Sequence, residues 1–133
     1  MSNSLALLRK VLLLDAVTCV AAGLLMLVGG EALSEPLGLS ARLLQIAGVS
    51  LLPFAAYLVY VARRAVLPRS QVWIIVAANA LWVLDSALIL ATGWVQPTLL
   101  GYAFVIGQAL AVLVLAQLEV RGVRRLSGHG VVA

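Results

Sequence analysis

Residues 72–94, VWIIVAANALWVLDSALILATGW, form an almost unbroken apolar run that contains one asparagine and one aspartate. An α-helix rises about 1.5 Å per residue, so a run of this length reaches across a hydrocarbon core of about 30 Å. Soluble domains seldom contain an apolar segment this long. We therefore predict that residues 72–94 form a membrane-spanning helix.

Three further apolar runs of similar length occur in the chain, at residues 5–29, 43–62 and 98–120. Glycine, proline and charged residues separate them: Gly29-Gly30, Arg63-Arg64 with Pro68, and Gln96-Pro97. A polar tail follows at residues 121–133. The pattern predicts a single all-α domain, an integral membrane four-helix bundle in contact with the lipid bilayer.

The composition agrees with a membrane protein. Apolar side chains make up 64% of the 133 residues and charged ones 11%, and the mean hydropathy is +1.14. Soluble domains are about half apolar and a quarter charged. The net charge of +4 does not indicate nucleic-acid binding, because the basic residues lie at the ends of apolar runs and are not interleaved with aromatic ones.

The basic residues also predict an orientation. Most of them lie near the first run, in the second loop and in the tail: Arg9, Lys10, Arg63, Arg64, Arg69, Arg121, Arg124 and Arg125. The first loop contains only Arg42, and the third contains no basic residue. Lys and Arg are retained on the cytoplasmic side, so we predict a multi-pass protein of the cell (inner) membrane with both termini in the cytoplasm.

A short internal repeat relates the first and third runs. Leu14-Asp15-Ala16 matches Leu84-Asp85-Ser86, and small residues followed by glycine come after each. The match suggests two tandem helical hairpins in a parallel repeat. Chance is the alternative, because Ala, Leu and Gly recur throughout the chain.

Asp85 raises the main question about function. An aspartate at the centre of a spanning helix costs about 2.5–3.5 kcal/mol, so we expect it to face the interior and to find a partner. Asn79 and Trp82 share a helical face that Asp85 borders. The other candidate members of a polar centre are Arg9, Asp15, Tyr57 and Gln108. The centre either fixes helix registry or binds a proton, an ion or a small solute.

Small residues mark a candidate helix interface. Ala103, Gly107 and Ala111 recur at intervals of four and form one ridge on the last run. Such a ridge lets another helix backbone approach closely. It serves either packing within the chain or the seam of a homo-oligomer.

The chain lacks the residue clusters that enzymes and metalloproteins need. The only histidine, His129, lies in the tail, and Cys19 is the only cysteine. Haem and metal sites require several such ligands, and acyl transfer requires a base next to a nucleophile. We therefore expect no catalytic residues, no metal and no cofactor.

Two functions remain after these exclusions. The first is a small non-enzymatic integral membrane protein with a buried polar centre around Asp85, which binds or transports a proton, an ion or a small polar or cationic solute. The second is an accessory or assembly subunit of a larger membrane complex that uses the small-residue ridge. Water access to Asp85 favours the first function, and an exposed ridge favours the second.

Overall fold

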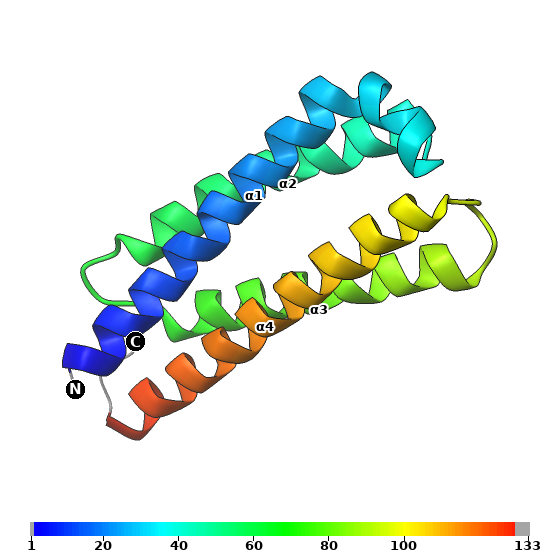
Figure 1. Ribbon diagram of the computed structural model, residues 1–133. Helices are drawn as coiled ribbons and strands as arrows, with labels where there is room; N and C mark the ends of the chain where they lie inside the picture. The colour runs from blue at the N-terminus through cyan, green and yellow to red at the C-terminus, as the bar shows by residue number, and fades with distance from the viewer. Residues whose placement is uncertain (1, 130–133) are drawn as a thin grey trace.

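The part of the chain that the structure describes consists of helices and the loops that join them. The computed structural model describes residues 2–129, and the side chains of residues 5–125. Its helices are α1 (Ser2–Leu37), α2 (Ala41–Ala62), α3 (Arg69–Ala91) and α4 (Leu99–His129) (Figure 1). Each contains a segment long and apolar enough to cross a membrane, which indicates a multi-pass membrane protein. The prediction of an all-α chain with four candidate spans is confirmed.

The helices form two hairpins that meet along one side. α1 packs on α2, and α3 packs on α4, while α1 also packs on α4 (Figure 1). Contacts between α2 and α3 are few. The start of α1, the end of α4 and the α2–α3 connection lie at the same end of the molecule (Figure 1). We call this the basic end, because it contains Arg9, Lys10, Arg63, Arg64, Arg69, Arg121, Arg124 and Arg125.

α1 is longer than the sequence predicts. It passes through Gly29-Gly30 and continues to Leu37. A Cβ on Gly30 would lie 2.8 Å from Gln45 Cγ, so this glycine permits close packing of α1 on α2 and does not end the helix. The helix ends at Gly38, whose φ of +68° suits glycine and whose backbone N–H donates to the carbonyl of Ser34 at 2.9 Å.

The other helices also differ from their predicted bounds. α4 continues from the predicted end at residue 120 to His129, and so includes much of the segment expected to be a polar tail. α3 begins at Arg69 and ends at Ala91, before Gly93 with its φ of +75°. α2 begins at Ala41 because the Ser40 hydroxyl caps it, accepting a hydrogen bond from Leu43 N at 3.0 Å.

Glycines allow the closest helix contacts. A Cβ on Gly48 of α2 would lie 2.6 Å from the carbonyl oxygen of Gly23 on α1. At the far end, a Cβ on Gly101 of α4 would collide with the carbonyl oxygen of Leu37. Backbones that approach this closely exclude larger side chains, as is typical of helices packed in membranes.

Candidate functional site

A buried polar cluster joins three of the helices. Asp15 of α1, Asn79 of α3 and Glu119 of α4 are 1%, 3% and 0% exposed. The amide nitrogen Nδ2 of Asn79 donates one hydrogen bond to Asp15 Oδ2 and another to Glu119 Oε1, both at 2.9 Å. One amide group therefore holds two carboxyl groups together where the two hairpins meet.

The two carboxyl groups have little else to compensate their charge. They accept from the same amide nitrogen and therefore lie close together, and Glu119 Oε2 is buried without a hydrogen-bond partner among the described residues. Within residues 5–125, no salt bridge joins either group to a basic side chain. Burying two adjacent negative charges is far more costly than one amide can offset. The geometry is therefore suited to a proton held between the carboxyl groups.

A cavity lies beside this cluster. The Cys19 thiol is 3.6 Å from Asp15 Oδ1, to which it donates. Cys19, Ser50, Asn79 and Trp82 are among the residues that line a cavity of about 190 Å³, which we call the Asn79 cavity. It lies where α2 and α3 have few contacts. The cluster thus borders a space large enough for water.

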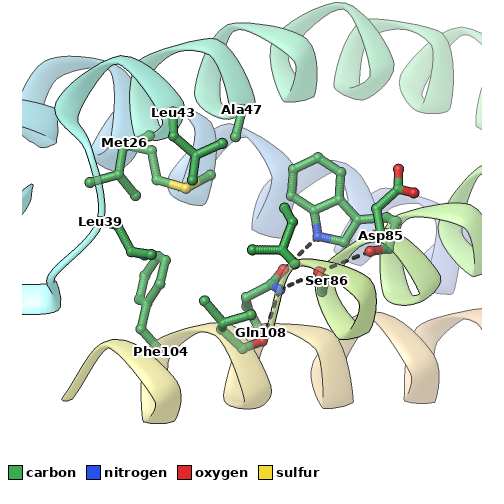
Figure 2. Close-up of a pocket in the computed structure, with 12 residues that line it drawn as sticks. Met26, Leu39, Leu43, Ala47, Asp85, Ser86, Phe104 and Gln108 are labelled. Atoms are coloured by element: carbon green, nitrogen blue, oxygen red, sulfur yellow. Dashed lines mark hydrogen bonds between the residues drawn. The ribbon is translucent and has the colours of Figure 1, made fainter. Parts of the chain in front are cut away.

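A second set of hydrogen bonds joins α3 to α4. Trp82 Nε1 donates to Gln108 Oε1 at 2.6 Å, and Gln108 Nε2 donates to Ser86 Oγ at 3.1 Å (Figure 2). These three side chains line another cavity of about 190 Å³, which we call the Asp85 cavity. Trp82 lines both cavities.

The expectation that Asp85 is buried and paired is wrong. Its side chain is exposed, and it makes no hydrogen bond or salt bridge with the residues that the structure describes. Figure 2 shows its carboxylate at the edge of the Asp85 cavity, apart from the bonds between Ser86 and Gln108. Asn79 lies at the middle of α3, whereas Asp85 lies six residues before the last residue of the helix.

Arg9, another candidate member of the polar centre, does not pair with Asp85 in the part of the chain that the structure describes. The Arg9 guanidinium donates to the carbonyl oxygen of Ala62 and, at 3.2 Å, to that of Ala65. It therefore binds the end of α2 at the basic end. Tyr57 of α2 is half-buried and packs against the apolar core that includes Leu12.

The structure thus divides the predicted polar centre. It brings Asp15 to Asn79, and Trp82 to Gln108, but leaves Arg9 and Tyr57 outside both groups. Asp85 shares only a cavity with Trp82 and Gln108.

Glu119 is the member of the site that the sequence analysis missed. In sequence it lies close to Arg121 and near the end of an apolar run, the usual place of an interfacial charge. The available signal was its helical face, which it shares with the buried residues Leu115, Ala116 and Val123.

The small-residue ridge of α4 faces away from the rest of the chain. Ala103, Gly107 and Ala111 are all exposed. A Cβ on Gly107 would meet nothing within 4 Å. The ridge therefore plays no part in the described helix contacts.

The comparisons with known proteins add no identity. No family model matches the chain, and neither curated proteins nor solved structures match it.

Proposed function

We propose that this is a small non-enzymatic membrane protein that binds a proton at the Asp15–Glu119 carboxyl pair and couples it to a small polar or cationic solute. One observation carries the proposal: a single Asn79 nitrogen serves both buried carboxyl groups, while Glu119 Oε2 has no partner among the described residues. Ionisable groups inside membrane segments commonly mark proton and ion pathways.

The proton would control the charge of the cluster. A proton on Glu119 allows its carboxyl to donate to Asp15, and a single negative charge then remains, supported by Asn79. Loss of that proton would leave two charges side by side, which only water or a cation can compensate. The Asn79 cavity offers the nearest space for either. Protonation would therefore be linked to what enters between α2 and α3.

The proposed setting is a four-helix bundle in the cell inner membrane. The hairpins α1–α2 and α3–α4 meet through α1 and α4, and the basic end would lie in the cytoplasm. The tandem-repeat hypothesis would make Asp15 and Asp85 equivalent, yet one is buried and the other exposed. If the repeat is real, its two acids have taken different roles.

Proton movement in proteoliposomes tests the proposal. Protein is reconstituted around a pH-sensitive dye, and a potassium diffusion potential is imposed with valinomycin. We expect the wild type to carry protons, Glu119→Gln to carry few, and Glu35→Gln, which removes an exposed acid elsewhere, to match the wild type. Equal rates in the wild type and Glu119→Gln would contradict the proposal.

A second candidate function follows from the exposed ridge. An accessory or assembly subunit, or a homo-oligomer, would use Ala103, Gly107 and Ala111 as its contact face. In light scattering with detergent correction, Gly107→Leu would then lower the mass of the assembly. Ala56→Leu, which also introduces a leucine at an exposed position but on α2, is the control. An unchanged mass in Gly107→Leu would exclude the ridge as a seam.

A further inference from the structure

We propose that the Asp85 cavity binds an organic cation, an ammonium group that carries an apolar substituent. This inference names the class of solute in the proposed function, and therefore rests on that function. The binding itself depends on residues other than the carboxyl pair.

The first reason is an uncompensated charge. Asp85 lies within an apolar spanning segment, is exposed, and has no hydrogen bond or salt bridge within the described chain. An aspartate at the centre of a spanning helix costs about 2.5–3.5 kcal/mol, and Asp85 lies six residues inside the end of α3. A cation from outside the chain is the direct form of compensation.

The second reason is the apolar surroundings of the carboxylate. Asp85 lines the Asp85 cavity of about 190 Å³, which has Met26, Leu44 and Phe104 in its wall. It also lines a second, more open space of about 560 Å³, together with Leu88, Ile89, Thr92 and Trp94. In Figure 2 the carboxylate lies to one side of the lining side chains and points away from Ser86 and Gln108.

The apolar side chains that line these two spaces determine which kind of cation can bind. Metal ions such as Ca²⁺ or Mg²⁺ require several oxygen ligands, and apolar side chains cannot replace the water that such an ion would lose. An alkylated or arylated ammonium loses less hydration and can place its apolar group in the cavity. Trp82 lines one space and Trp94 the other, so an indole ring is available to a cation in either space.

Calorimetry with two probes tests the inference. Wild-type protein in a non-ionic detergent is titrated with benzyltrimethylammonium and with tetramethylammonium. We expect the benzyl compound to bind more tightly, because its ring can enter the cavity. Asp85→Asn should weaken its binding about tenfold or more, which corresponds to about 1.4 kcal/mol. Asp85→Glu should keep most of the affinity.

Matched variants separate this site from other effects. Glu35→Gln removes an equal charge from an exposed position that lines neither space, and should leave binding within about twofold, close to the error of the measurement. Because Asp85 is exposed, Asp85→Asn should fold normally, which its melting temperature will show. Phe in place of Trp82 or of Trp94 should weaken binding, while Trp73→Phe should not.

Three results would overturn the inference. The first is that the wild type and Asp85→Asn bind the benzyl compound equally well. The second is that the wild type binds neither compound. The third is that the wild type binds neither compound and Asp85→Asn forms a smaller assembly. The third would mean that a basic side chain of a second copy occupies the site. Proton movement that still depends on Glu119 in any of these cases would leave the carboxyl-pair proposal standing.

Discussion

Asp15 and Glu119 accept hydrogen bonds from the same atom, Nδ2 of Asn79, at 2.9 Å each. They come from α1 and α4, the helices through which the two hairpins pack on each other. A change of charge on this pair therefore acts at the contact between the hairpins. α2 contributes no residue to the cluster and contacts α3 only slightly, and the Asn79 cavity lies on that side.

Asn79 should stabilise the fold through both carboxyl groups. Asn79→Leu removes two buried hydrogen bonds and leaves the acids without their shared donor. We expect a loss of about 2–3 kcal/mol in the free energy of unfolding, measured by denaturation in mixed detergent micelles. Ser50→Ala is the control, because the Ser50 hydroxyl bonds only within its own helix, to Ile46 O. An equal effect of both variants would contradict a shared-donor role.

Replacing two different glycines of α4 with alanine should have different effects on the stability of the fold. Gly101→Ala places a Cβ against the backbone carbonyl of Leu37, which cannot move without shifting α1, and should cost about 2–3 kcal/mol. Gly107→Ala meets open space, so it should be neutral or stabilise by up to about 1 kcal/mol through helix propensity. Melting temperatures in detergent compare the two. Similar losses in both would show that Gly107 is also packed.

Arg9 and Asp85 should be energetically independent. Arg9→Gln removes a donor from the carbonyl oxygens of Ala62 and Ala65, and should cost about 1 kcal/mol. A double-mutant cycle with Asp85→Asn should give a coupling below about 0.5 kcal/mol, because the two side chains share no partner. A coupling above about 1 kcal/mol would mean that they pair in the membrane.

The helices could be predicted from the sequence because lipid demands long apolar segments, and runs such as residues 72–94 satisfy this by length alone. Their ends were less certain. Gly29-Gly30 looked like a stop, but a glycine that packs against Gln45 is compatible with a continuous α1. The end of α4 was also placed too early, because charged residues continue a helix beyond its apolar part.

The site was only partly predictable. Asn79 and Asp15 stood out as polar residues in apolar runs, and the structure brings them together. Asp85 looked equivalent to Asp15, but adjacent residues on a helix differ by about 100° in direction, so burial of Ser86 turns Asp85 outward. Glu119 was hidden by its closeness to Arg121. Its helical face was the available signal, and the packing of α1 on α4 shows that it points inward.

The orientation can be tested with single cysteines. In a Cys19→Ala background, cysteines replace Trp94, at the turn between α3 and α4, and Ser70, at the basic end. With the basic end in the cytoplasm, a membrane-impermeant maleimide should label the Trp94 site in intact cells. It should label the Ser70 site only after permeabilisation. The reverse pattern would contradict the proposed orientation.

The shared proton is most directly tested by infrared spectroscopy of the carboxyl groups in reconstituted protein. The wild type should show the C=O stretching band of a protonated carboxyl at neutral pH, and the band should shift in D₂O because the Asn79 cavity admits water. Glu119→Gln should lack the band, and Glu35→Gln should keep it. Absence of the band from the wild type, or its persistence in Glu119→Gln, would contradict a proton held between Asp15 and Glu119.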